Sequence, residues 1–281
     1  SLSGGLDSSL VCAMAKKLGY KFDCYVLDAG VSGDRDAAKL VTDHLGLTLK
    51  VVKVTKDDVK EAIPLLVKAL ATYNITIILG ALCTYFISKA ASKDGLKVLF
   101  FGDGADETFG GYRRYKECEG AEEVQEKLIY DQKQLWLTQN KRLDHASMAE
   151  SIEARVPFQD LNVVINSRDI PLHKKVDERN KFKDKIILRE IAEKYLPTKI
   201  ASREKTVVSR GTGLNTLLIE AIKDMWGKPY LHPITNHDLK AYGVEDKVEI
   251  ILFTFFKKNY YFLSGNIADL EARNLYSRSF A

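Results

Sequence analysis

The stretch Ser3-Gly4-Gly5-Leu6-Asp7-Ser8-Ser9, close to the start of the sequence, decides the fold class. Its two adjacent glycines let the backbone approach an anion closely, and the helical pattern that follows presents free N–H groups at its positive end. The serines add hydroxyl donors, so the loop has the composition of a phosphate cradle. The alternative is a plain strand-to-helix turn in which Asp7 only caps the helix.

Asp7 is the unusual member of this loop. A carboxylate beside a phosphate repels it unless a cation lies between them, and Mg²⁺ commonly binds one or two carboxylates together with phosphate oxygens. The loop lacks the Gly-Lys-Ser/Thr sequence of the Walker pattern. We therefore expect a phosphate site of another type, with Mg²⁺ beside Asp7.

Helix and strand signals alternate after this loop through the first hundred residues. Helices are expected at 8–18, 36–45, 55–71 and 77–92, and short apolar strands at 22–27, 47–54 and 97–101. This alternation predicts an α/β fold, a parallel sheet with helices on both faces. After about residue 115 the strand signals fade, and helical patterns follow at 122–141, 184–195, 214–225 and 246–258.

We therefore expect an α/β nucleotide-binding core over about 1–115 and a mostly helical C-terminal part over about 116–281. The two parts are expected to share one core and to act as a single domain.

A second glycine-rich segment follows the strand expected at 97–101. It reads Phe101-Gly102-Asp103-Gly104-Ala105-Asp106-Glu107-Thr108-Phe109-Gly110-Gly111-Tyr112. Ligands of open α/β sheets bind at the carboxyl ends of the strands, which is where this segment and the first loop both begin. Its three carboxylates and four glycines are hard to explain by packing alone.

This second segment resembles the S-G-E-G-A-D-E-x-F-G-G-Y signature of asparagine synthetases and of the related β-lactam synthetases. The first loop resembles the pyrophosphate loop of the ATP pyrophosphatases. Further similarity lies in the run from Glu153 to Asp160, close to E-A-R-V-P-F-L-D, and in Leu188-Arg189-Glu190 and Arg203-Glu204-Lys205. The resemblance implies an adenine nucleotide alpha-hydrolase-like fold. It also implies an ATP-dependent ligase that adenylates a carboxylate, releases AMP and pyrophosphate, and transfers the acyl group to ammonia or an amine.

The resemblance also assigns a role to each matching residue. Asp7 and Asp106 would bind Mg²⁺, and the pyrophosphate would be cradled by Ser3, Gly4, Gly5 and Ser8. The backbones of Val26 and Gly102 would contact the nucleoside. Asp103 would lie near the acceptor or the attacking amine, and Lys205 would neutralise charge in the transition state.

Three departures from the family pattern bear on the substrate. Asp103 stands where the family has Glu, Phe101 replaces a small Ser, and Leu79 occupies the place of an expected active-site Arg. Either another basic residue substitutes for that Arg, or the acid differs from aspartate. The alternatives to asparagine synthesis are an amide ligase for another acid, including closure of a β-lactam, and an inactive nucleotide-binding subunit.

Composition sets the remaining expectations. The chain has 281 residues, 46% hydrophobic and 28% charged, with a net charge of +4 and dispersed basic residues, so nucleic acid is not an expected partner. Four cysteines without a C-x-x-C pair, and no apparent signal peptide or membrane span, predict the cytoplasm. A glutamine-hydrolysing domain is not recognised in this sequence. Nitrogen is therefore expected from ammonia, a substrate amine or a separate glutaminase subunit, and a homo-oligomer is a further possible assembly.

Overall fold

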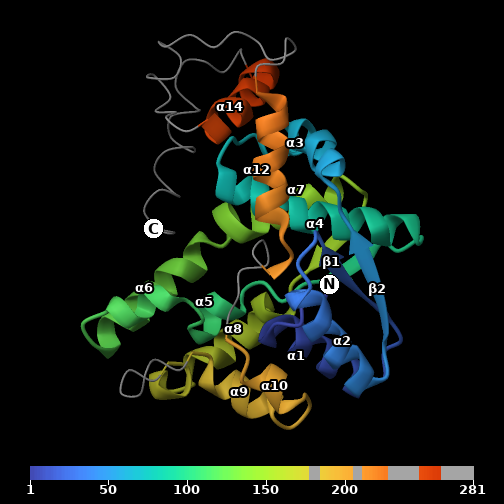
Figure 1. Cartoon of the computed structure of the whole chain (residues 1–281). Helices are drawn as coiled ribbons and strands as arrows, with labels where there is room; N and C mark the ends of the chain where they lie inside the picture. Colours follow the sequence, from blue (N-terminus) through green and yellow to red (C-terminus); the bar gives the residue numbers. More distant parts are fainter. Residues whose placement is uncertain (177–183, 205–210, 227–246, 261–281) are drawn as a thin grey trace.

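The computed structural model of the chain describes residues 1–176, 184–204, 211–226 and 247–260 (Figure 1). Within this part of the chain the strands are short and pair in parallel. The two pairs are β1 (Asp23–Asp28) with β2 (Thr48–Lys53), and β3 (Val98–Phe100) with β4 (Glu153–Arg155).

The first residues of the chain connect these two strand pairs. The amino group of Ser1 donates to the carbonyl of Phe100 at 2.8 Å, and the N–H of Leu2 donates to the carbonyl of Tyr25 at 2.8 Å. The described residues thus form two parallel pairs joined through Ser1 and Leu2, where a continuous parallel sheet was expected. The glycine-rich loop that follows Leu2 begins between the two pairs.

Helices make up most of the described structure. They are α1 (Leu6–Lys17), α2 (Gly33–Leu45), α3 (Lys56–Leu70), α4 (Ile75–Lys93), α5 (Ala105–Phe109), α6 (Ala121–Gln134), α7 (Lys141–Met148), α8 (Leu161–Arg168), α9 (Ile186–Ala192), α10 (Thr198–Ala201), α12 (Leu214–Met225) and α14 (Lys247–Tyr260). Short turns of tighter or wider helix lie at η1 (Arg113–Glu117), η2 (Trp136–Asn140), η3 (Pro157–Gln159) and η4 (Leu172–Lys174).

Local signals explain where several of these helices begin and end. Thr55 and Asp58 form a capping box at the start of α3, in which the Thr55 hydroxyl accepts from the Asp58 N–H and the Asp58 carboxylate accepts from the Thr55 N–H. Asn74 caps α4 by accepting from two backbone N–H groups. Gly46 ends α2 in the left-handed conformation, with φ 63°. The helix expected from the sequence at 55–71 begins at the Thr55 cap, and the one expected at 36–45 ends directly before Gly46.

The long helix expected at 122–141 is divided in two. After α6, the π-helical turn η2 intervenes before α7 begins. A π-helical turn keeps the chain helical while it shifts the buried face, so apolar periodicity does not reveal it. This break determines the direction of α7, which carries Arg142 towards the candidate site.

Both faces of β1 are covered by helices. Cys24 and Val26 point into one core, which they share with residues of α1, α2 and α9. Tyr25 and Leu27 point into the other, which contains residues of α3, α4, α12 and α14. The second group of helices occupies the upper half of Figure 1 and the first group the lower half. The expected covering of β1 on two sides is confirmed.

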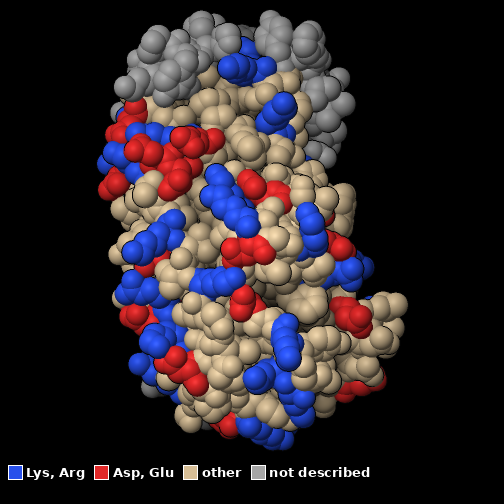
Figure 2. All heavy atoms as spheres, turned by 90° about the vertical axis from the view of Figure 1, so that its right-hand side faces the viewer, with Lys and Arg blue, Asp and Glu red and all other residues tan. Residues whose placement is uncertain are grey.

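Helix α4 alone among the described helices is long and apolar enough to cross a membrane, with a mean hydropathy of 1.5. It lies in the interior, where Ile78, Ala81 and Leu82 have no exposed surface. These features are those of the core helix of a globular protein. On the face shown in Figure 2, Lys and Arg are interleaved with Asp and Glu, with no continuous basic area.

Candidate active site

The first loop folds tightly onto the start of α1. The Ser3 hydroxyl accepts from the Gly5 N–H at 3.3 Å and lies 3.2 Å from the Ser8 hydroxyl. Gly4 has φ 71°, and a Cβ there would lie 2.5 Å from the Cβ of Ala37. Gly4 is therefore needed because the loop packs directly on α2. Ser3 and Ser8 remain as the hydroxyl pair at the N-terminus of α1.

The second loop passes directly against the first. A Cβ at Gly102 would lie 2.7 Å from the backbone nitrogen of Ser8, so only glycine fits where the two loops touch. Gly104, with φ 96°, then starts the short helix α5. This geometry brings Asp106, on α5, close to Asp7, on α1.

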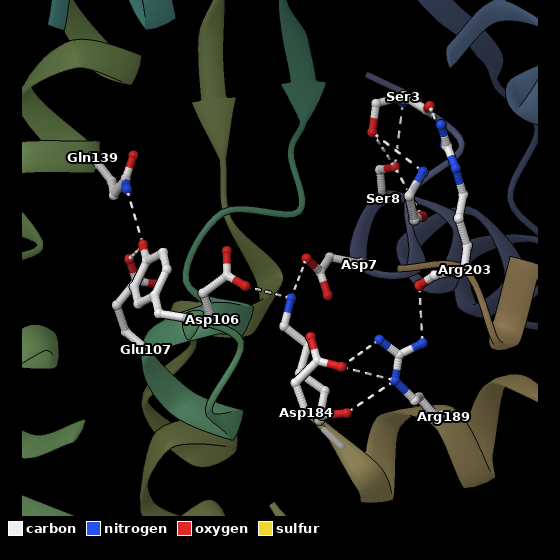
Figure 3. Close-up of polar contacts among 12 residues, drawn as sticks. Ser3, Asp7, Ser8, Asp106, Glu107, Gln139, Asp184, Arg189 and Arg203 are labelled. Atoms are coloured by element: carbon white, nitrogen blue, oxygen red, sulfur yellow. Dashed lines mark hydrogen bonds and ion pairs between the residues drawn. The ribbon is translucent and has the colours of Figure 1, made fainter. Parts of the chain in front are cut away.

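A lysine that sequence reasoning missed lies between these two carboxylates (Figure 3). The ammonium Nζ of Lys185 is 2.6 Å from Oδ2 of Asp7 and 2.6 Å from Oδ1 of Asp106, and 3% of its side chain is exposed. Burial by itself lowers the pKa of Lys185, but the charges and hydrogen bonds of Asp106 and Asp7 outweigh it and raise the pKa above its usual value. Lys185 is therefore an ammonium ion with two counterions.

Gly111 makes room for this cluster. A Cβ at Gly111 would lie 1.9 Å from Oδ1 of Asp106 and 2.2 Å from Cε of Lys185. Both distances are far shorter than any normal van der Waals contact, so a side chain at this position displaces the lysine or the carboxylate. The second glycine of Gly110-Gly111 is required here by the packing of Lys185.

Arg189, on α9, holds the backbone before and after its own helix. Its Nε donates to the carbonyl of Asp184 at 2.9 Å, and its Nη1 donates to the carbonyls of Ala201 and Arg203 at 2.8 and 3.0 Å. Lys185 itself has φ 50°, a conformation that costs a non-glycine residue free energy and needs support from its surroundings. Arg189 gives that support by fixing the preceding residue.

Arg203 connects the same network to the first loop. Its Nη1 donates to the carbonyl of Ser3 at 3.3 Å, and its Nη2 donates to Oδ1 of Asp34 at 2.9 Å. Burial raises the pKa of Asp34 although Arg203 counteracts the shift. The contacts drawn in Figure 3 thus run from Ser3 through Arg203 and Arg189 to Asp184, the residue before Lys185.

A tyrosine closes another side of the site. The Tyr112 hydroxyl donates to Oε1 of Glu107 at 2.5 Å and accepts from Nε2 of Gln139 at 3.2 Å. Burial and the adjacent Glu107 raise the pKa of Tyr112, so the phenol stays protonated. It contributes a neutral hydroxyl to the wall.

These elements surround a cavity of about 360 Å³. This volume lies within the range of about 300–1,000 Å³ that is common for small-molecule sites. The predicted site residues that line it are Ser3, Gly5, Asp7, Ser8, Val26, Gly102, Asp103 and Asp106. Gly4 does not line it, because it packs on α2. Lys205 lies outside the described residues.

Lys185, Arg142, Arg189 and Arg203 also line the cavity, and sequence reasoning assigned none of them a role there. Lys185 and Arg189 belong to the stretch around Leu188-Arg189-Glu190, and Arg203 opens Arg203-Glu204-Lys205. The motif matches were the available signal for Arg189 and Arg203, whereas Lys185 lies three residues before the first motif. Arg142 opens the stretch from Arg142 to Asp160 that resembles the family, but no role was assigned to it.

The pair Asp7 and Asp106 fits a magnesium site. The two carboxylates already converge on one cationic group, the ammonium of Lys185. Hard oxygen ligands of this type suit Mg²⁺, which completes its coordination with phosphate oxygens and water. No cluster of three or more His, Cys, Asp or Glu side chains arranged for a metal occurs in the described part of the chain, so the protein would supply only part of the coordination.

Comparison with known proteins adds independent information. The sequence model of the family described as asparagine synthase matches residues 1–120 and 116–229. Asparagine synthetase B of Escherichia coli K12, named as glutamine-hydrolysing, is 30% identical over 238 residues, which are 80% of this chain and 42% of that protein. The nodule asparagine synthetase of Pisum sativum, also named as glutamine-hydrolysing, is 32% identical over 238 residues, 79% of this chain and 40% of that protein.

The chain spans less than half the length of the curated relatives that it matches. The family match nevertheless covers most of the chain, including both glycine-rich loops and the stretch that carries Lys185, Arg189 and Arg203. This chain therefore belongs to the asparagine synthase family.

Proposed function

We propose that this protein is an ATP-dependent amide-forming ligase. It adenylates a carboxylate with release of pyrophosphate and transfers the acyl group to ammonia or an amine. Synthesis of asparagine from aspartate is the first candidate reaction. The observation that carries the proposal is the cluster of Asp7, Asp106 and Lys185 at the meeting point of the two loops, inside the cavity.

The first loop suits the β and γ phosphates of ATP. The hydroxyls of Ser3 and Ser8 and the backbone N–H groups at the start of α1 are donors suited to phosphate oxygens. Val26 and Gly102 border the same cavity, where their backbones can contact the nucleoside. Bound Mg²⁺, held by Asp7 and Asp106, would neutralise part of the charge of the leaving pyrophosphate.

Lys185 is a second cation for that charge. Its ammonium is fixed by two carboxylates and by the support of Arg189, so little reorganisation is needed when charge develops on the pyrophosphate. The lack of a Walker lysine in the first loop further supports cleavage between the α and β phosphates. AMP and pyrophosphate are the expected products.

Lys205 remains the proposed catalytic lysine for transition-state charge. Arg203 and Glu204, which belong to the same family motif as Lys205, both line the cavity. Asp103 is proposed to act near the attacking amine.

Residues 1–281 are proposed to form one synthetase domain, with nitrogen from free ammonia, a substrate amine or a separate glutaminase subunit. The cytoplasm is the proposed compartment.

An amide ligase for an acid other than aspartate is the second candidate function. Leu79 and Asp103 favour it, because both depart from the family pattern in the wall of the cavity. An inactive nucleotide-binding subunit is less well supported. The buried cluster of Lys185 with two carboxylates costs desolvation free energy, which a nucleotide-binding subunit without catalysis would not need.

The test is carboxylate-dependent exchange of labelled pyrophosphate into ATP, measured with a panel of carboxylic acids. Exchange that depends on one acid supports adenylation and identifies the substrate. Chromatography of a complete reaction with ammonia then identifies the nucleotide product. ADP as the main product would contradict the adenylation mechanism.

A further inference from the structure

Leu79 cannot supply the charge that an arginine at its position would provide. It lies on α4, and its side chain packs against the apolar core next to the cavity. About one turn to either side on α4 lie Thr76 and Cys83, which line the same cavity. Burial raises the pKa of the Cys83 thiol to about 12, so it is neutral. This wall, taken from α4 alone, is uncharged.

Arg142 brings a cation to this wall from another helix. It lies on α7, and its side chain crosses α4 at Gly80, where a Cβ would lie 2.6 Å from Cδ and 2.6 Å from Nη1 of Arg142. Any side chain at position 80 would therefore displace the guanidinium. The absence of a side chain at Gly80, beside Leu79, leaves the space that Arg142 fills.

The Arg142 side chain lines the cavity, where one of its nitrogens is paired with Asp103. Its Nη2 donates to Oδ1 of Asp103 at 2.6 Å, while Nε is buried without a hydrogen-bond partner among the described residues. Both side chains of the pair are about three-quarters buried, with 22% of Arg142 and 23% of Asp103 exposed. A guanidinium has five N–H donors and binds a carboxylate through two of them.

We infer that Arg142 determines the specificity for the acid. It binds an anionic group that the acid carries in addition to the carboxylate that is activated, and Gly80 gives it the space to do so. Asp103, on the other side of the guanidinium, favours an acid with a positive charge next to that anionic group. The inference rests on the proposed function for the reacting carboxylate, but the binding step can be measured without turnover.

The test uses three acids that differ by one group each. L-aspartate carries two carboxylates and an amine, succinate lacks the amine, and β-alanine lacks one carboxylate. Calorimetric titration of each acid into the protein is expected to show binding of aspartate that is tighter than that of β-alanine by roughly ten- to a hundredfold, the effect of one charged hydrogen-bonded contact. Succinate should fall between them, because it keeps the second carboxylate.

Two variants remove the arginine contact in different ways. Arg142→Met deletes the charge, and Gly80→Ala keeps the charge but displaces it. Both are expected to abolish the preference for aspartate over β-alanine while the affinity for ATP stays unchanged. The double variant should reduce the preference for aspartate over β-alanine no further than Arg142→Met alone, because both changes act on the same contact. Leu79→Arg in the Arg142→Met background should restore part of the preference.

Matched controls separate this effect from general damage. Arg168→Met removes an exposed arginine of α8, and Gly33→Ala adds a Cβ whose nearest neighbour is 3.9 Å away. Both should keep the wild-type preference, and thermal denaturation should show that all variants are folded.

The outcomes distinguish the two proposals. Tight binding of aspartate that depends on Arg142, without pyrophosphate exchange, supports the inference and contradicts the proposed function. Exchange activity with an unchanged preference in Arg142→Met and Gly80→Ala overturns the inference and leaves the function standing. Equal binding of the three acids by the wild type, or no binding of any, also overturns the inference.

Discussion

Asp7 and Asp106, which belong to different glycine-rich loops, share one counterion, the buried ammonium of Lys185. The two loops are thereby held together by charge as well as by the close approach of Gly102 to Ser8. Each carboxylate would be poorly tolerated in this position without a cation, because neither burial nor the neighbouring carboxylate favours its charge.

Lys185→Met should destabilise the protein when no divalent cation is present. Removing one partner of a buried ion pair costs about 3–5 kcal/mol, and we expect a value near the lower end because Asp7 and Asp106 remain partly exposed. Added Mg²⁺ should restore more stability to the variant than to the wild type. Urea denaturation with and without Mg²⁺ measures both effects. Lys174→Met, which breaks an exposed pair with Glu190, is the control, and an equal response of both variants to Mg²⁺ would contradict the assignment.

Asp7→Asn and Asp106→Asn should each weaken the use of Mg²⁺ with pyrophosphate while the fold stays intact. Each change removes one of the two negative charges that face the ammonium of Lys185 and the proposed metal. The measurement is the Mg²⁺ dependence of pyrophosphate exchange, which should shift to higher Mg²⁺ concentration. Full activity of both variants across the titration would show that the metal assignment is wrong.

Gly111→Ala should impair the same cluster without altering any charge. The added methyl group would lie 1.9 Å from Asp106 Oδ1 and 2.2 Å from Lys185 Cε, so one of them must move. Overpacking of this kind typically costs about 1–3 kcal/mol. Reduced stability together with reduced pyrophosphate exchange is expected, with Gly33→Ala as the matched glycine variant. An active and stable Gly111→Ala protein would mean that Lys185 can take another position at no cost.

Lys205→Ala should lower kcat and leave the KM of the substrates nearly unchanged. A lysine that meets charge only in the transition state typically contributes about 2.7–4 kcal/mol, or roughly a hundred- to a thousandfold in rate. Lys205→Arg should recover little, because a planar guanidinium does not replace a compact ammonium. Steady-state kinetics with ATP and the identified acid measures the effect. A near-normal kcat would make Lys205 an ordinary surface residue.

Asp224 should make stability depend on pH in the acid range. Hydrogen bonds from Lys56 and Lys60 lower its pKa to about 2, and these contacts join α12 to the start of α3. The pKa of Asp224 in the folded protein lies below the usual value of about 3.9 for an unfolded chain. Its ion pairs therefore contribute fully to the free energy of unfolding above about pH 3.9, and this contribution is lost as the pH falls towards 2. Asp224→Asn should therefore be less stable than the wild type at neutral pH, and the difference should narrow below about pH 4 in urea denaturation. A difference that is constant with pH would contradict this role.

The two glycine-rich loops and the helices of the first hundred residues could be predicted because their signals are local. A capping residue such as Thr55, or a terminal glycine such as Gly46, acts within one turn of the chain. β4 was missed because three residues are too few to show a pattern. The π-helical turn between α6 and α7 was missed because it leaves the helical composition unchanged.

The charged residues of the site were harder to predict, because their positions depend on contacts between distant segments. Arg142 reaches the cavity because Gly80, on another helix, has no side chain. The sequence showed a missing arginine at Leu79, and it contained no local sign of which residue would take its place. Lys185 was likewise hidden, since its partners Asp7 and Asp106 are brought to it only by the folded chain.

The single guanidinium of Arg189 contacts the residue before Lys185 and the backbone of Arg203, two positions before Lys205. The spacing between these two stretches is therefore set by one side chain, and neither stretch can change its length or path without affecting the other. Loss of Arg189 would therefore release the residue before Lys185 and the backbone of Arg203 together.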